Sequence, residues 1–224
     1  MQLSIIIPTL NEESTIAATL DTIEITKKDI EVILVDGYST DKTIALSQPY
    51  DTLILQTEKG RARQMNEGAE HAKGSILMFL HADTLLPHNY STLISRAILE
   101  HKETAWGYFD VALSGTRTAF RIIETMINFR TALSQVASGD QAIFVKRDIF
   151  FDVGGFPNIE LMEDIAFTKR LKRISKPARI KQRVTTSSRR WSDSGIVRTI
   201  LLMWSLRLAF YLGINPGRLK AFYK

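Results

Sequence analysis

Acidic side chains suited to cation binding occur at separated places in the sequence, and Asp83 is the first of them to consider. It follows an apolar run, and a carboxylate there can hold Mg²⁺ or Mn²⁺ against phosphate oxygens. His81, two residues earlier, would lie on the same side of an extended segment and would tilt the preference towards Mn²⁺. His81 could equally pack or be solvated. We therefore expect Asp83, with His81 as a second candidate, to bind a divalent cation.

Glu163 and Asp164 form an acidic pair at the start of a predicted charged helix. Acidic residues suit the first turn of a helix because of its dipole, so the pair could be purely structural. Adjacent carboxylates also repel, which can raise the pKa of one while the other stays ionised and accepts a proton from a hydroxyl. Glu163 and Asp164 are therefore the candidate catalytic residues.

Arg61 and Arg63 open another predicted helix, where a guanidinium could bind phosphate through two hydrogen bonds or could simply face solvent. The sequence has neither a GxGxxG pattern nor a P-loop. A diphosphate would therefore have to be bound by a cation and by arginine side chains.

The hydrophobic pattern predicts the scaffold for these residues. Short apolar runs alternate with helical segments in the first half, which predicts a parallel sheet covered by helices on both faces. The expected strands are 3–7, 31–35, 52–56 and 75–80, and the expected helices are about 14–25, capped by Asn11, and 60–73, ended by Gly74. Ligands bind such a sheet beyond the carboxyl ends of its strands, where polar candidates stand at Thr9, Asn11, Glu12, Asp36 and Asp83. Each of them taken singly could be only a cap or turn former.

The second half is less regular. We expect strands at 105–113 and 141–145, helices at 118–136, 149–153, 163–174 and 196–212, and extended chain at 179–189. No repeat or linker interrupts the sequence, so we expect a single α/β domain over 1–224. Within it, 1–84 would be the nucleotide-binding half, 85–192 the acceptor-side half, and 193–224 a C-terminal apolar helix and tail.

Bulk composition limits the function classes. The 224 residues are 45% hydrophobic, have a formal charge of +5 and include no cysteine, which excludes disulfides, thiolate metal sites and cysteine nucleophiles. The positive charge suits anionic partners, but no dense basic patch interleaved with aromatics points to nucleic acid. The start of the chain has no basic region typical of a signal peptide. We therefore expect a cytoplasmic protein.

Taken together, these motifs resemble glycosyltransferase family 2 from about Leu3 to Trp191. The resemblance rests on Ser4 to Glu12, Val35 to Asp41, Gly60 to Asn66, Leu80 to Asp83, Gly139 to Gln141, Gly154 to Phe156 and Met162 to Asp164. It implies a GT-A fold with a mostly parallel central sheet, a nucleotide-sugar donor with a UDP-sugar favoured, a divalent cation, and inverting transfer to an acceptor hydroxyl.

The resemblance also implies roles by position. Pro8, Thr9, Glu12 and Asp36 would hold the nucleoside, Arg63 would assist the diphosphate, Asp83 would bind the cation, and Asp164 would be the base. The further candidates for substrate binding are Asn11, Arg61, Asn66, Asp140, Arg190 and Trp191. The sequence departs from the family pattern at His81, which occupies the first acidic position of the metal motif, and at Ser187, where processive members have Gln before the Arg190-Trp191 pair. Trp191 could stack on a sugar or anchor the core.

The apolar helix expected over 196–212 is rich in aromatics and has basic residues around it. It could lie in a membrane interface, on the inner face of the membrane, which would suit a lipid-linked acceptor. The favoured alternative is that it closes the core or forms an oligomer contact. Arg198 and Arg207 within it argue against a membrane span.

Two other functions share these residues. A nucleotide-sugar binding module without catalysis would keep the contacts of Asp36 and Asp83 but would not depend on Asp164. A sugar-phosphate nucleotidyltransferase would use the same sheet edge, but residues 8–16 contain no glycine where that class normally has a glycine-rich signature. Glycosyl transfer is the function that the motifs favour.

Overall fold

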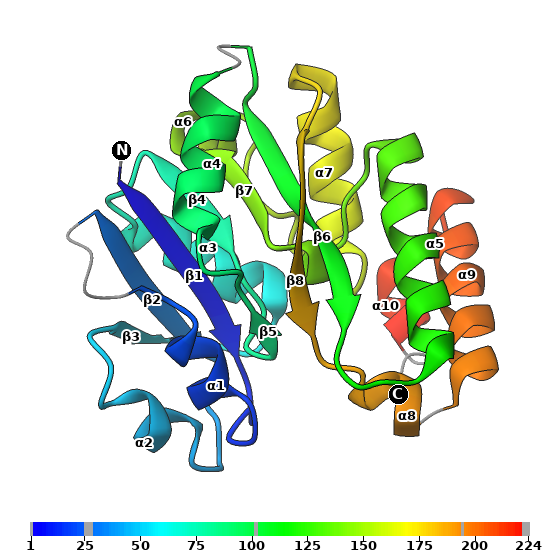
Figure 1. The fold of residues 1–224 in the computed structure, drawn as a ribbon, viewed down its shortest axis with the longest axis horizontal. Helices are drawn as coiled ribbons and strands as arrows, with labels where there is room; N and C mark the ends of the chain where they lie inside the picture. The colour runs from blue at the N-terminus through cyan, green and yellow to red at the C-terminus, as the bar shows by residue number, and fades with distance from the viewer. Residues whose placement is uncertain (1, 25–28, 101–102, 194, 221–224) are drawn as a thin grey trace.

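An eight-stranded sheet with the order β3-β2-β1-β4-β7-β6-β8-β5 forms the centre of the structure (Figure 1). The structure is a computed structural model that describes residues 2–24, 29–100, 103–193 and 195–220. Parallel pairing joins the first four strands, as the alternation of strand and helix predicts. These strands are β1 (Leu3–Thr9), β2 (Ile30–Asp36), β3 (Leu53–Gln56) and β4 (Ile76–Phe79).

The second half adds strands in both directions. Strand β7 (Ile143–Lys146) runs antiparallel to β4, and β6 (Trp106–Leu113) runs antiparallel to β7. Strand β8 (Ala178–Thr186) is parallel to β6, and the two-residue strand β5 (Thr84–Leu85) closes the far edge antiparallel to β8. The sheet is thus mostly parallel, and the antiparallel strand β7 joins its two halves.

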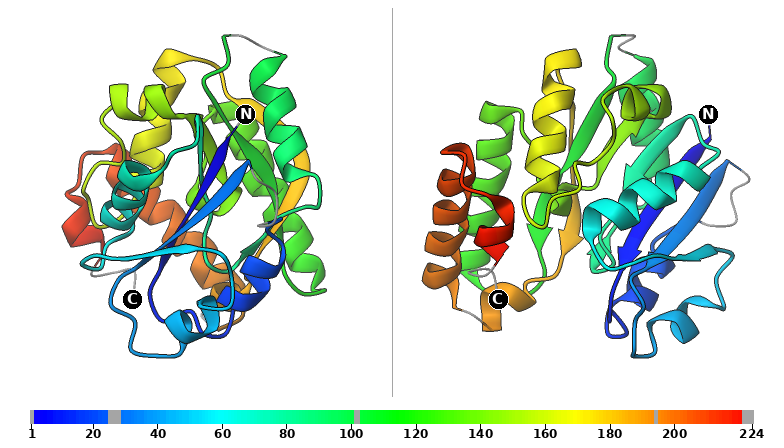
Figure 2. Two further views of the ribbon diagram at one scale, coloured as in Figure 1. Left: turned by 90° about the vertical axis from the view of Figure 1, so that its left-hand side faces the viewer. Right: turned by 180° about the vertical axis from the view of Figure 1, so that it is seen from behind.

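Helices cover both faces of the sheet (Figure 2). One face packs against α1, α4 and α5, and the other against α3, α6 and α7. Their bounds are α1 (Ile16–Asp21), α3 (Arg61–His71), α4 (Tyr90–Leu99), α5 (Thr118–Ser134), α6 (Arg147–Asp152) and α7 (Glu163–Ile174). The remaining helices are α2 (Thr43–Ser47), the short η1 (Gly139–Gln141), α8 (Arg189–Asp193), α9 (Ile196–Tyr211) and α10 (Pro216–Lys220).

Strand β1 shows why the apolar runs form this sheet. All seven of its residues are buried. Ile5 and Ile7 belong to one core layer and Ile6 to the other, as the period of two in a strand requires. Helix α3 approaches β1 closely at Gly68, where an added Cβ would lie 2.5 Å from Cγ2 of Ile6.

Four phenylalanines fix α7 against the end of β4. Phe79, Phe150, Phe156 and Phe167 pack with ring centroids between 4.2 and 6.3 Å apart. Phe79 ends β4 just before His81, and Phe167 lies one turn after Asp164. This aromatic cluster therefore positions two of the candidate motifs relative to each other.

Three predicted helix ends are wrong. Helix α1 begins after Thr15, because Asn11 adopts a left-handed conformation (φ 55°) and accepts a hydrogen bond from the backbone of Thr40 instead of capping a helix. The same helix ends at Asp21, short of Ile25, which itself lies outside the described residues. Helix α3 ends at His71, before Gly74, because Ala72 is already extended.

Helix α9 closes the apolar core on one side only. Leu206, with Leu202 and Phe210, packs in the apolar cluster at the start of α7, and Ile196 and Ile200 pack against α5. On its other side, Leu201, Trp204 and Leu208 are each 60–64% exposed. The helix lies beside α5 at the side of the molecule away from β1, β2 and β3 (Figure 1). Among the residues that the structure describes, no helix has both the length and the apolar character to cross a membrane.

Candidate active site

A pocket of about 350 Å³ lies beyond the carboxyl ends of β1 and β4. Segments from both halves of the chain meet there: the loops after β1 and β4, the start of α3, η1, the start of α7, and α8. The predicted site residues that line it are Pro8, Glu12, Arg61, His81, Asp83, Asp140, Glu163, Asp164, Arg190 and Trp191. Pockets of this size hold small-molecule ligands.

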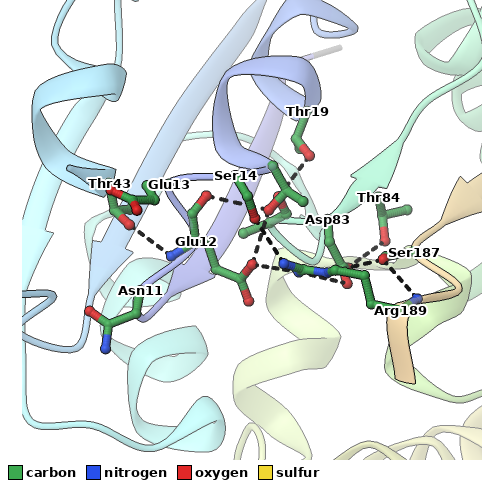
Figure 3. A network of polar contacts seen from close by, with 12 residues as sticks. Asn11, Glu12, Glu13, Ser14, Thr19, Thr43, Asp83, Thr84, Ser187 and Arg189 are labelled. Carbon is green, nitrogen blue, oxygen red and sulfur yellow. Dashed lines mark hydrogen bonds and ion pairs between the residues drawn. The ribbon is translucent and has the colours of Figure 1, made fainter. Parts of the chain in front are cut away.

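Asp83 lies beside an arginine that the sequence analysis did not select. Nη2 of Arg189 is 3.8 Å from Oδ2 of Asp83, and the same nitrogen donates to Oε2 of Glu12 at 2.9 Å (Figure 3). Nη1 of Arg189 donates to the hydroxyl of Ser14 at 2.9 Å. Burial raises the pKa of Asp83, while the positive charge of Arg189 acts in the opposite direction.

His81 pairs with Asp140 on the other side of the pocket. Nδ1 of His81 lies 3.2 Å from Oδ1 of Asp140. Burial disfavours the protonated imidazole, but the hydrogen bond and charge of Asp140 outweigh it and raise the pKa of His81. Burial likewise opposes the ionised form of Asp140, yet His81 lowers the pKa of Asp140. The other nitrogen, Nε2, packs against Gly139, where an added Cβ would be 2.5 Å away.

The acidic pair at the start of α7 has two different environments. Oδ2 of Asp164 accepts the backbone N–H of Gly139 at 2.7 Å, and Oδ1 accepts the backbone N–H of Ile165 at 2.7 Å. Glu163 is buried, and burial together with the charge of Asp164 raises the pKa of Glu163. The carboxylate of Asp164 therefore has a fixed orientation at the pocket wall, while the proton of Glu163 is held more tightly than usual.

Thr9, Asn11 and Asp36 border the pocket without lining it. Asp36 is fully buried and accepts hydrogen bonds from the N–H and hydroxyl of Ser39, at 2.9 and 2.5 Å, and from Gln56 at 3.3 Å. The Asn11 amide joins the same loop through Thr40. These contacts order the edge formed by the ends of β1 and β2.

Arg63 and Asn66 are not brought into the pocket. Arg63 forms an ion pair with Glu58 next to α3. The side-chain amide of Asn66 donates to the carbonyl of Phe156 at 2.8 Å and accepts the N–H of Phe156 at 2.9 Å. Asn66 thus holds the loop after α6, and the guanidinium that α3 presents to the pocket is that of Arg61.

Arg189 is the main site residue that sequence reasoning missed. Arg189 directly precedes Arg190, which the sequence did single out, and this adjacency was the available signal. Although consecutive residues point in different directions from a helix, both arginines line the pocket. The contact between Arg189 and Glu12 joins residues 177 positions apart.

The side chains at the pocket fit a divalent cation that takes its remaining ligands from a substrate. Among the described residues, no group of three or more His, Asp and Glu side chains is arranged to hold a metal ion alone. Mg²⁺ and Mn²⁺ at phosphate sites are commonly held by one or two carboxylates together with phosphate oxygens and water. Asp83 suits that arrangement, whereas His81 has one ring nitrogen paired with Asp140 and the other packed against Gly139.

The sheet order and the position of the pocket at the carboxyl edge of the sheet are those of the GT-A fold. The family model described as "Glycosyl transferase family 2" matches residues 4–156. The chain belongs to this family.

Relatives with known names are also glycosyltransferases. A "PGL/p-HBAD biosynthesis glycosyltransferase" of Mycobacterium bovis (strain BCG / Pasteur 1173P2) is 34% identical over 167 residues, which cover 68% of this chain and 62% of the relative. "Glycosyltransferase AglE" of Haloferax volcanii is 27% identical, with 75% of this chain and 60% of the relative covered. The chain thus spans about three fifths of the length of these relatives.

Solved structures share the fold at low sequence identity. TarS from S. aureus in complex with UDP-GlcNAc has a TM-score of 0.69 and 19% identity, with 84% of this chain and 59% of that chain covered. Glucosyl-3-phosphoglycerate synthase from Mycobacterium tuberculosis, in complex with Mn²⁺, UDP and glucosyl-3-phosphoglycerate, has a TM-score of 0.62 and 18% identity, with 83% and 70% covered. The similarity to these two structures shows the GT-A fold of this chain.

Proposed function

We propose that this protein transfers a sugar from a nucleotide-diphosphate sugar to an acceptor hydroxyl, with inversion at the anomeric carbon and with a divalent cation. The observation that supports this best is the meeting of carboxylates and guanidinium groups around one pocket. Asp83, Asp164, Arg61 and Arg190 come from four different elements or loops, and all line it.

We assign the nucleoside to the edge formed by Pro8, Thr9 and Asp36, and the diphosphate to the side of the pocket where Arg61 and Arg190 lie. Guanidinium groups bind phosphate oxygens through charge-assisted hydrogen bonds. Asp83 would hold Mn²⁺ or Mg²⁺, which when bound supplies positive charge to the departing nucleoside diphosphate. A UDP-sugar is the favoured donor class, because the two similar structures described above are complexes with UDP-GlcNAc and UDP.

Asp164 is assigned as the general base. Its two hydrogen bonds to backbone N–H groups hold the carboxylate at the pocket wall. There it would take the proton of an acceptor hydroxyl as that oxygen attacks the anomeric carbon from the side opposite the leaving group. The single displacement from the opposite face accounts for inversion.

A donor screen tests this proposal. Purified protein is incubated with UDP-, GDP- and dTDP-sugars, with and without Mn²⁺, while thermal unfolding and release of nucleoside diphosphate are both measured. We expect one nucleotide class to stabilise the fold only with the cation and to be slowly hydrolysed. Stabilisation without any release under all conditions would instead identify a binding module.

A further inference from the structure

An apolar groove of about 570 Å³ runs between α5 and α9 and opens into the pocket described above. Its walls are mostly hydrophobic, with Met126 on α5 and Leu201, Trp204, Leu208 and Tyr211 on α9. These side chains are 40–64% exposed, which is unusual for so many large apolar groups on neighbouring helices. The two helices lie side by side in Figure 1 and in the right-hand view of Figure 2, and Ile123 of α5 packs with Ile196 and Ile200 of α9.

The groove is continuous with the pocket. Six residues line both: Ile127, Ser138, Asp140, Trp191, Met203 and Arg207. A molecule lying in the groove would therefore meet mostly apolar side chains until it reaches the wall that also contains Asp164. The lining thus changes from mostly apolar in the groove between α5 and α9 to charged in the pocket.

Arg130 of α5 also lines the groove. Nε of Arg130 is buried and has no hydrogen-bond acceptor within the part of the chain that the structure describes. Its neighbour Nη2 donates to Thr131 at 3.0 Å. Leaving such a buried donor without an acceptor costs free energy.

We propose that this groove, the α5–α9 groove, binds the acceptor, and that the acceptor is an amphipathic alcohol with an apolar chain. The chain would lie between Met126 and Leu201, and the hydroxyl-bearing head group would reach Asp140 and Asp164. This inference rests on the proposed function, because it names the acceptor of that transfer. Continuity with the pocket favours a single bound chain over a flat contact with a membrane or with a second copy of the protein.

Alkyl glucosides below their critical micelle concentrations provide the probe. Trp191 and Trp204 line the groove, whereas Trp106 is buried in the core, so tryptophan emission reports binding. We expect octyl glucoside to change the emission and to bind up to about fifteenfold more tightly than hexyl glucoside, since two more methylene groups are buried. Glucose alone should have no effect on the emission.

Leu201→Glu and Leu133→Glu form a matched pair of variants. Leu201 lines the groove and is 62% exposed, whereas Leu133 lies on α5 outside the groove and is 76% exposed, so both proteins should fold. We expect Leu201→Glu to weaken octyl glucoside binding by about tenfold or more, because a charge then faces the chain, and Leu133→Glu to change it less than about twofold. Equal losses in both variants would overturn the groove in favour of a flat apolar surface, and no emission change in the unmodified protein would also overturn it.

Turnover separates this inference from the proposed function. With the donor present, octyl glucoside should accelerate release of nucleoside diphosphate above the rate with water or glucose. Donor turnover without dependence on chain length would refute only the acceptor groove. Octyl glucoside binding without any donor turnover would refute the transfer function and the acceptor role together.

Discussion

Replacement of Asp164 by asparagine separates catalysis from folding. The carboxylate accepts two backbone hydrogen bonds, from Gly139 and Ile165, both at 2.7 Å. Asparagine has one side-chain oxygen, so one of the two bonds to the carboxylate is lost, at a cost of about 1.5–3 kcal/mol. For a domain of this size, that loss lowers the melting temperature by roughly 3–12 °C. The variant should therefore fold at room temperature.

The expected effect on activity is much larger. An amide does not accept the proton of an attacking hydroxyl, and removal of a general base typically slows a reaction by about 10²–10⁴-fold. This corresponds to about 2.7–5.4 kcal/mol in the activation barrier. Release of nucleoside diphosphate at saturating donor measures the rate, and stabilisation by the donor in thermal unfolding measures binding in the same samples.

Asp148→Asn is the matched control. Asp148 also accepts the N–H of the next residue at a helix start, Ile149 at 2.8 Å, but it does not line the pocket. Its rate should stay at the level of the unmodified protein. A rate for Asp164→Asn within tenfold of the unmodified protein, with donor binding intact, would refute the assignment of Asp164 as the base.

Three other predictions follow from contacts around the site. The buried Glu124 accepts the N–H of Leu113 at 2.6 Å, so Glu124→Ala should lower the free energy of unfolding by about 1–3 kcal/mol in urea titrations, and Glu124→Gln by clearly less; equal losses would contradict this. Gly139→Ala should displace the His81 ring, because the added Cβ would lie 2.5 Å from Nε2 of His81. We expect this variant to lose about 1–3 kcal/mol of the free energy of unfolding and to bind the donor more weakly. Unchanged stabilisation by the donor in thermal unfolding would contradict the prediction. Burial and the charge of Asp164 raise the pKa of Glu163 in the folded state. The protonated Glu163 therefore stabilises the fold fully below its pKa in the unfolded chain, and this contribution is lost as the pH rises through its pKa in the folded protein. Glu163→Gln should therefore gain melting temperature relative to the unmodified protein between pH 4 and pH 8, and a pH-independent difference would show that Glu163 has no raised pKa.

The parallel half of the fold was predictable from local pattern alone. Apolar runs such as residues 3–7 exist because both faces of a parallel sheet are covered, and the polar residues after them must then share one edge. The antiparallel insertion of β7 and the two-residue strand β5 were not predictable. Their pairing depends on contacts between distant segments rather than on residue periodicity.

The candidate site was predictable where a motif places a residue at a strand or helix end, as for Asp83 and Asp164. Side-chain direction was not. Arg63 and Asn66 stand in the right helix, but one pairs with Glu58 and the other with Phe156. Arg189 shows the opposite case, because only the folded chain reveals that it reaches Glu12.

Calorimetric titration of the nucleoside diphosphate selected by the donor screen tests the central claim most directly. The claim is that Asp83 holds a cation against that diphosphate. We predict that Mn²⁺ tightens nucleotide binding at least about tenfold in the unmodified protein, and that this gain disappears in Asp83→Asn while binding without Mn²⁺ changes little. The same Mn²⁺ dependence in both proteins, or none in the unmodified protein, would contradict it.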